Sequence, residues 1–458
     1  MKQGQKIIRP FLPAGRRMTL AVIAFLAGIS FLAGAAAVAL ESHSAAVIDL
    51  GDSAALLVTL GKLCGLLAGS LVLLQFVLSA RLKSLDRIFG LHGLFVSHRV
   101  LGVSAVIFAS FHPMLIFAPK AVTMPALHIR IWPILVGVAL LMGLWAGVSI
   151  ALWRKFLDLP YSCWYRMHCI GMFGATALLT IHVGNVARDF FRGWPRYALI
   201  AAVSMYAILF IVVILIKPWL GKKRKFKVER VSFAGKNTYA IELKPKNGGT
   251  FSYAPGQFAF VTFYSPLLPV ERHPWTISSA PTRPQTLTFT IKCSGDFTNR
   301  ISHLKPGDEA VVDGPYGRFS YPAHVRDHQR ELIMIAGGVG VTPMLSMLGY
   351  MTDIGENKKV ILIWSNKTED DILYRKELEA IWNDMEGLTI RQVLTRQKDF
   401  AGLTGRLDAV MLKGILTGWD RNGEVFVCGP PPMMAAVCRG LKQIGFKARR
   451  IHSEKFSY

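Results

Sequence analysis

The stretch LFVSHRVLGVSAVIFASFHPMLIFA, residues 94–118, is long and apolar, yet it contains two histidines, His98 and His112. As a helix rising about 1.5 Å per residue, it is long enough to cross a hydrocarbon core of about 30 Å. An ionisable side chain inside such a segment is costly and usually indicates function. Because 14 residues come close to whole helical turns, we predict both histidines on one face, about 21 Å apart.

A second apolar segment, residues 165–183, repeats this spacing with His168 and His182. Haem iron in an electron-transfer cytochrome takes two axial imidazoles, so two parallel helices with matched pairs can hold two stacked haems. We predict that His98 faces His168 near the cytoplasm. His112 and His182 would form the second pair, near the outside. A lone histidine would more often hydrogen-bond between helices, but two equal spacings favour a ladder of metal ligands.

The six cysteines never form C-x-x-C or C-x-x-C-H, which argues against an iron–sulfur cluster, structural zinc and covalently attached haem. The predicted haems are therefore b-type. Arg99 and Arg166 stand beside the inner pair in the sequence. They can contact haem propionates or be the cations typical of a cytoplasmic membrane face, and the sequence leaves both open.

Six apolar segments are long enough to span a membrane. Basic residues follow the second, fourth and sixth, which places both termini in the cytoplasm, although Arg188, Arg192 and Arg196 in an outer loop depart from this pattern. The first segment resembles a signal peptide but is long enough to be an uncleaved span. We expect an integral protein of the plasma or inner membrane, with lipid as a partner. The segments are residues 18–40, 54–80, 94–118, 131–152, 165–183 and 197–216.

The composition of the 458 residues agrees with this division, since 52% are hydrophobic and only 18% are charged. A net charge of +24 could indicate a nucleic-acid partner. No zinc-ligand spacing, basic helix or stacking motif accompanies the charge, and much of it flanks apolar segments. We therefore predict no nucleic-acid binding.

After residue 227 the apolar runs become short and alternate with Gly and Pro turns, as in a small antiparallel β-barrel. From Glu331 strands alternate with helical stretches, which predicts a parallel α/β sheet. We predict three domains at 1–220, 221–325 and 326–458. The barrel strands are expected in FKVERVSF, TYAIEL, FAFVTFY, WTISS, LTFTIK and EAVVDG, and the parallel strands in ELIMIAGG, KVILIWS, TIRQVLT and EVFVCG.

The barrel region contains PGQF at 255–258 and HPWTISS at 273–279. A flavin needs an aromatic face, a hydroxyl or amide near N5, and cations or backbone amides for its phosphates. Trp275 could equally be ordinary barrel core. The predicted flavin residues are His273, Pro274, Trp275, Thr276, Lys292 and Thr298.

Two glycine-rich turns follow predicted strands, GGVGVTP at 337–343 and CGPP at 428–431. Small residues let backbone amides approach a pyrophosphate at a helix N-terminus, although the third glycine of G-x-G-x-x-G is absent. The alternative is that the glycines serve packing only. The predicted nucleotide-binding residues are Gly337, Gly338, Gly340, Thr342, Pro343, Cys428, Gly429 and Pro430.

PGQF, HPWTISS, DGPYG, GGVGVTP, CGPPPMM and a terminal E-x-F, in this order, resemble the ferredoxin–NADP reductase superfamily. With the histidine ladder, the chain resembles the NADPH oxidase and ferric reductase family from about residue 94 onward. The resemblance implies a six-helix haem bundle, an FAD domain and an NAD(P)H domain. It implies that Thr276, Cys428 and Phe456 form the catalytic centre, with Thr276 near flavin N5. Phe456 would cover the flavin, and Tyr458 is its rival.

We therefore expect a transmembrane enzyme that carries electrons from cytoplasmic NAD(P)H through FAD and two haems to an outer acceptor. Molecular oxygen, giving superoxide, is favoured over ferric chelates because the HPWT motif looks more like the oxidase branch. NADPH is favoured over NADH because Arg396, after the strand TIRQVL, suits a 2′-phosphate. A transporter with a reductase-like regulatory domain and a haem-free membrane anchor are the alternatives.

Overall fold

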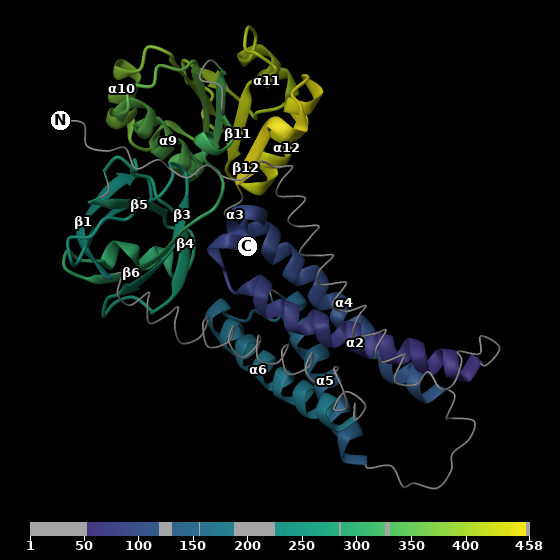
Figure 1. Ribbon diagram of the computed structural model, residues 1–458. Helices are drawn as coiled ribbons and strands as arrows, with labels where there is room; N and C mark the ends of the chain where they lie inside the picture. The colour runs from purple at the N-terminus through teal and green to yellow at the C-terminus, as the bar shows by residue number, and fades with distance from the viewer. Residues whose placement is uncertain are drawn as a thin grey trace. The chain divides into compact units, whose positions relative to one another are not determined.

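The computed structural model describes residues 53–118, 131–154, 156–186, 225–283, 285–325 and 330–454. The chain divides into two compact units, one with the helices up to Val186 and one with the strands from Lys225 onward (Figure 1). The predicted spans at 18–40 and 197–216 and the terminal Phe456 and Tyr458 lie outside the described residues.

The first unit contains four long apolar helices whose length and composition allow them to cross a membrane. Four of the six predicted spans are thus seen among the described residues, and a six-helix bundle is not confirmed. Few of their side chains are buried in the unit, as expected of helices with lipid-facing surfaces. The helices are α2 (Ser53–Ser79), α4 (Leu91–Phe117), α5 (Ile131–Trp153) and α6 (Tyr161–Val186), with a short α3 (Lys83–Phe89) before α4.

The second unit begins with a six-stranded antiparallel sheet in the order β4-β3-β6-β1-β2-β5. Burial alternates along β6, so one face packs on a core while the other is partly exposed. The edge strands β4 and β5 form no ladder among the described residues. Just after β4, Ile277 makes an isolated bridge with Phe289 and Ser278 donates its N–H to the carbonyl of Thr288, so a closed barrel is not confirmed. The strands are β1 (Lys225–Gly235), β2 (Thr238–Pro245), β3 (Phe258–Tyr264), β4 (Arg272–Thr276), β5 (Leu287–Lys292) and β6 (Glu309–Tyr316).

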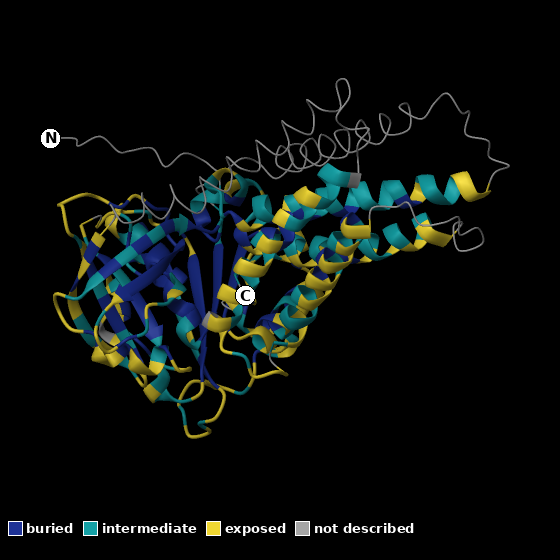
Figure 2. Cartoon of the chain, turned by 90° about the horizontal axis from the view of Figure 1, so that it is seen from below, coloured by how far each residue is buried: buried dark blue, intermediate teal, exposed yellow. Residues whose placement is uncertain are grey.

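The predicted parallel sheet is present, in the order β10-β9-β8-β7-β11-β12. Its central strands are buried along their whole length, dark blue in Figure 2. They are buried because residues of α9 and α10 pack on one face and residues of α11 and α12 on the other. The short edge strands β10 and β12 are additions to the prediction. The strands are β7 (Leu332–Gly337), β8 (Val360–Asn366), β9 (Leu388–Leu394), β10 (Leu403–Thr404), β11 (Glu424–Cys428) and β12 (Ile451–Glu454). The helices are α9 (Thr342–Asp353), α10 (Arg375–Asp384), α11 (Ala409–Ile415) and α12 (Pro431–Gln443).

The order of the parallel strands defines where a ligand can bind. From β7 the chain continues to β8 and β9 on one side and then returns to β11 on the other. Such a reversal opens a crevice at the carboxyl ends of the two strands that flank it. The glycine-rich turns after β7 and β11 lie at this point.

Short 3₁₀ helices lie at Thr298–His303, Tyr321–Ala323, Gly338–Val341, Glu369–Asp371 and Ala448–Arg450.

Candidate functional site

The four histidines form two pairs between α4 and α6. The ring centres of His98 and His168 are 6.2 Å apart, and those of His112 and His182 are 6.3 Å apart. A metal held between two imidazoles at about 2 Å from each nitrogen separates the ring centres by about 6 Å. The described residues hold no group of three or more His, Cys, Asp or Glu for a metal. By their inter-ring distances, both pairs would fit a haem iron held by two imidazoles.

The pair His112 and His182 is hydrogen-bonded to the backbones of neighbouring helices. His112 Nδ1 lies 2.8 Å from the carbonyl oxygen of Gly61, and His182 Nδ1 lies 3.0 Å from that of Pro133. A carbonyl only accepts, so Nδ1 of each ring must carry the proton. This leaves Nε2 as the nitrogen with a free electron pair, as a metal ligand requires.

His273 lies on β4 in an aromatic and acidic environment. Its ring centre is 4.1 Å from that of Phe297, and Nε2 is 3.0 Å from Oε2 of Glu271. Burial lowers the pKa of His273, although Glu271 opposes this effect. The histidine is therefore uncharged at neutral pH and suits a polar contact better than an ion pair with phosphate.

Trp275 shares the strand face with His273 and packs against the hydrophobic core beside Phe263, at 5.7 Å between ring centres. Trp275 therefore packs against the core of the antiparallel sheet, which is the alternative that the sequence left open. Its contact with a flavin remains a prediction. Thr276 is buried at the end of the strand, and the next residue, Ile277, donates its N–H to the carbonyl of Gln257.

The turn between Lys292 and Thr298 is held by the threonine hydroxyl. Thr298 Oγ1 accepts from the N–H of Ser294 at 3.0 Å and donates to the carbonyl of Gly295 at 3.2 Å. Lys292 lies 3.7 Å from Asp371 in the nucleotide-binding part of the same unit. Both predicted flavin residues therefore already have protein partners, and Thr298 shapes the backbone of the turn.

Gln257 joins two of the flavin motifs, a role the sequence analysis missed. Its Nε2 donates to the carbonyl of Gly317 at 2.9 Å, and its Oε1 accepts from the N–H of Ala254 at 2.8 Å. A β-carbon at Gly317 would stand 3.5 Å from Oε1 of Glu454, at the end of β12. The register pairs Glu454 with Cys428, so the flavin and nucleotide motifs converge at this place.

The two glycine-rich turns contact each other at the crevice. A β-carbon at Gly340 would stand 2.5 Å from the carbonyl oxygen of Cys428, and one at Gly429 would stand 3.0 Å from the nitrogen of Gly337. Gly340 and Gly429 therefore allow the two turns to pack closely, which is the alternative to nucleotide binding that the sequence left open. Gly338 differs, because it has φ +53° and faces open space. Its exposed backbone suits the close approach of a pyrophosphate.

The remaining predicted nucleotide residues lie beside these two turns, except Arg396. Thr342 begins α9 and donates from Oγ1 to the carbonyl of Val339 at 3.1 Å, and Pro343 follows in the first turn. Cys428 is fully buried, and burial together with Glu454 raises the pKa of its thiol well above the usual range. Cys428 is therefore a neutral thiol that shapes the site. Arg396 is exposed in the loop after β9.

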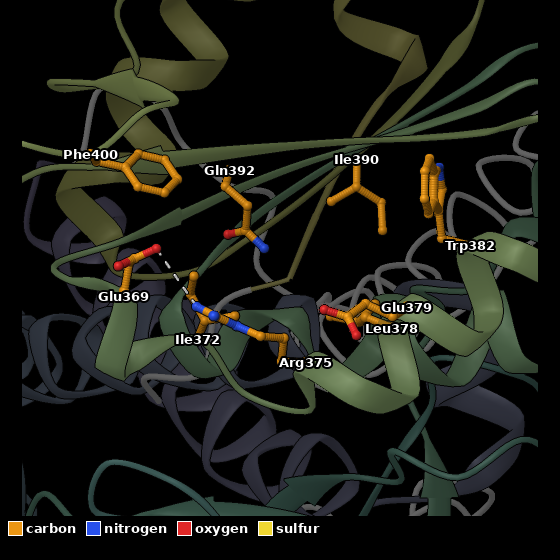
Figure 3. A pocket seen from close by; sticks show the side chains of 9 residues that line it. All are labelled: Glu369, Ile372, Arg375, Leu378, Glu379, Trp382, Ile390, Gln392 and Phe400. Atoms are coloured by element: carbon orange, nitrogen blue, oxygen red, sulfur yellow. Dashed lines mark ion pairs between the residues drawn. The ribbon is translucent and has the colours of Figure 1, made fainter.

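A pocket of about 310 Å³ lies away from this crevice, between α10 and β9 (Figure 3). Arg375 and Glu369 form an ion pair at 3.8 Å along one wall. None of the residues predicted from the sequence lines this pocket, so the predicted chemistry does not lie there. Its lining is Glu369, Ile372, Arg375, Leu378, Glu379, Trp382, Ile390, Gln392 and Phe400.

Comparison with known families agrees with the order of these parts. Residues 64–180 match a ferric reductase like transmembrane component, residues 223–320 an FAD-binding domain and residues 334–439 an oxidoreductase NAD-binding domain. Fold and matches together define a membrane-associated, FAD- and NAD(P)H-dependent oxidoreductase. These three matches, in this order, give the chain the domain architecture of the NADPH oxidase/ferric reductase family.

Curated relatives match the reductase part of the chain. A stachydrine N-demethylase reductase subunit of Rhizobium meliloti is 31% identical over 48% of this chain and 63% of its own length. A glycine betaine monooxygenase reductase subunit of Chromohalobacter salexigens is 34% identical over 45% of this chain and 56% of its own length. The chain thus spans little more than half of these relatives. The cytochrome b5 reductase domain of Ulva prolifera nitrate reductase has a TM-score of 0.45 and 20% identity, covering 50% of this chain and 96% of that one.

Proposed function

We propose that the chain is a transmembrane oxidoreductase that moves electrons from cytoplasmic NAD(P)H to an acceptor on the outer face, with FAD and two b-type haems as its redox groups. The observation that carries the proposal is the pair of inter-ring distances, 6.2 Å and 6.3 Å, between the same two helices. When bound, FAD supplies the exchange between two-electron and one-electron chemistry, and haem supplies one-electron chemistry.

The residues have separate tasks in this proposal. His98 and His168 hold the inner haem, and His112 and His182 hold the outer one. The HPWT strand, the turn from Lys292 to Thr298 and the DGPYG turn hold FAD. The backbone around Gly338 and the turn after Cys428 hold the NAD(P)H pyrophosphate. Phe456 covers the flavin, excludes water and must move before the nicotinamide reaches the ring.

The proposal includes the membrane topology and the domain limits. Six spans place both termini in the cytoplasm of a cell bounded by a plasma or inner membrane, with domains at 1–220, 221–325 and 326–458. The four described spans and the alternating basic flanks support this arrangement.

The first experiment measures haem in the purified full-length protein. Pyridine haemochrome analysis should give about two haems per chain, and His98→Ala or His168→Ala should remove one of them. His112→Ala or His182→Ala should remove the other. A haem-free anchor or a transporter would show no haem absorbance. Folded protein that keeps both haems in all four variants would falsify the ladder.

Molecular oxygen is the favoured acceptor and ferric chelates are the alternative. His112 and His182 would together hold the outer haem iron, so an acceptor would not be expected to bind the metal itself. Molecular oxygen, a small neutral molecule, can be reduced without binding the metal. Reduced coenzyme and FAD should support superoxide dismutase-sensitive dye reduction in air. Slow oxygen uptake with rapid anaerobic reduction of ferric citrate would favour the ferric reductase instead.

A further inference from the structure

The inner and outer histidine pairs are supported differently. The outer histidines bond through Nδ1 to carbonyl oxygens of α2 and α5. Nδ1 of His168 is buried and has no hydrogen-bond partner among the residues that the structure describes. Nδ1 of His98 is also buried and makes no hydrogen bond of normal geometry there, but the His98 ring lies near the backbone of Gln75. Some other contact must therefore fix the orientation of the His168 ring.

Trp164 supplies such a contact to His168. It lies four residues earlier on α6 and so on the same helix face. The two rings are stacked, with centres 5.4 Å apart and planes 24° apart. The indole Nε1 is buried and has no acceptor in the described part of the chain. A buried indole N–H normally has a hydrogen-bond partner, so this donor fits a carboxylate of a group held at His168.

Arg154 adds a positive charge at the same place. Its guanidinium carbon lies 5.6 Å from the ring centre of Trp164 and 5.6 Å from that of Tyr161. Its Nη1 makes one long contact, 3.5 Å, to the carbonyl of Leu159. Within the described ranges no carboxylate forms an ion pair with it. Arg154 can therefore pair with an anionic group beside Trp164.

Arg99 and Arg166, which the sequence offered as contacts for haem propionates, are less well placed for that role than Arg154. Arg99 and Arg166 are both exposed. One lies a single residue from its histidine and the other two residues, so helical geometry turns both away from the ligand face. Trp164, four residues before His168, lies on the same helix face as that histidine.

We infer that Trp164 is a positioning residue for the inner haem. Its ring fixes the plane of the His168 imidazole, and its Nε1–H donates a hydrogen bond to a haem propionate whose charge Arg154 balances. The inference rests on the proposed function, because it requires a haem between His98 and His168.

The test uses the full-length protein with Trp164→Phe, Trp164→Leu and Arg154→Gln. Phenylalanine keeps an aromatic ring but removes the N–H, whereas leucine removes both. Haem content, the electron paramagnetic resonance of the ferric protein and potentiometric titration are measured. The inner haem is the signal that His168→Ala removes, and the outer haem is an internal control. Trp145→Phe is the matched control, because its indole already donates to Ser110 Oγ at 3.0 Å.

Trp164→Leu should shift the inner low-spin resonance, because the imidazole plane is no longer fixed. Trp164→Phe should preserve that resonance but lower the inner midpoint potential, because propionate charge is less well balanced. Arg154→Gln should lower it likewise, and Trp145→Phe should leave the inner signal unchanged. Where Trp164→Leu fails to fold, Trp164→Phe and Arg154→Gln decide. A wild-type protein without haem contradicts the proposed function. A two-haem wild type whose inner resonance and potential persist in the Trp164 and Arg154 variants contradicts only this inference.

Discussion

A β-carbon at Gly137 would stand 2.6 Å from Cε1 of His182, so this glycine leaves the space that the imidazole ring fills. Gly65 does the same for His112, whose Nδ1 would lie 2.7 Å from an added β-carbon. Such distances are shorter than van der Waals contact allows. His112 and His182 can therefore approach the carbonyl groups of neighbouring helices only because these two positions have no side chain.

Gly137→Ala should displace His182 and reduce outer haem content, lowering total haem from about two per chain toward one. The inner haem should remain, because its ligands do not contact α5 at this position. Pyridine haemochrome analysis and the reduced absorbance spectrum measure both effects. Gly143→Ala on the same helix is the control, since an added β-carbon there meets no atom within 4 Å. Equal haem content in both variants would show that the space beside His182 is not required.

Gly340→Ala should weaken NAD(P)H binding, because the added β-carbon would stand 2.5 Å from the Cys428 carbonyl and separate the two turns. Overpacking of this kind costs about 1–3 kcal/mol of stability. Stopped-flow reduction of the flavin and thermal release of flavin fluorescence measure the two effects. Gly349→Ala is the matched control in α9, where the new carbon would lie 3.5 Å from Ala280. The packing argument is wrong if both variants reduce flavin at the wild-type rate.

Arg396→Ala should raise KM for NADPH about tenfold and leave KM for NADH unchanged, since only NADPH has a 2′-phosphate. Steady-state kinetics with both coenzymes measure this. Arg391→Ala removes an exposed charge from β9 itself and should change neither value. Equal KM values for the two coenzymes, unaffected by either substitution, would show that Arg396 is a solvated side chain with no contact to the coenzyme.

His324 should make the stability of the reductase unit depend on pH. Burial, followed by the stacked ring of His452, lowers the pKa of His324 from 6.5 to about 4. The unfolded chain then takes up a proton more readily than the folded one. Stability should be full above pH 6.5 and fall as pH drops toward 4, by at most about 3 kcal/mol. Flavin release on heating, followed at several pH values, measures the slope.

His324→Phe should flatten this dependence between pH 6.5 and 4, because no titrating group remains at the buried position. His303→Phe, at an exposed position, should keep the wild-type slope. The same slope in both variants would mean that other groups cause the acid sensitivity. The carboxylate of Glu424, which accepts from His452 at 2.8 Å and from Arg450 at 2.9 Å, is the next candidate.

The sequence by itself determined most of the elements and which polar residues they carry. Long apolar runs predict membrane-spanning helices, because a helix is what satisfies every backbone N–H and C=O group inside lipid. The shift to period-two and then to alternating strand and helix patterns predicted five of the six antiparallel strands and four of the six parallel ones. The fourth antiparallel strand, predicted at 275–279, instead covers Arg272–Thr276. The 14-residue spacing of His98 and His112 identified a ladder because helical geometry is regular over such distances.

Tertiary structure decided which groups meet, because contacts between helices or strands far apart in the sequence leave no periodic signal. Gly137 looks like any small residue in an apolar helix until His182 lies against it. Trp164 reads as one aromatic residue among several until its ring stacks on His168. The order β8-β7-β11, which brings the turns after β7 and β11 together beside Gly338, follows from how the strands pack, and no local sequence pattern predicts it.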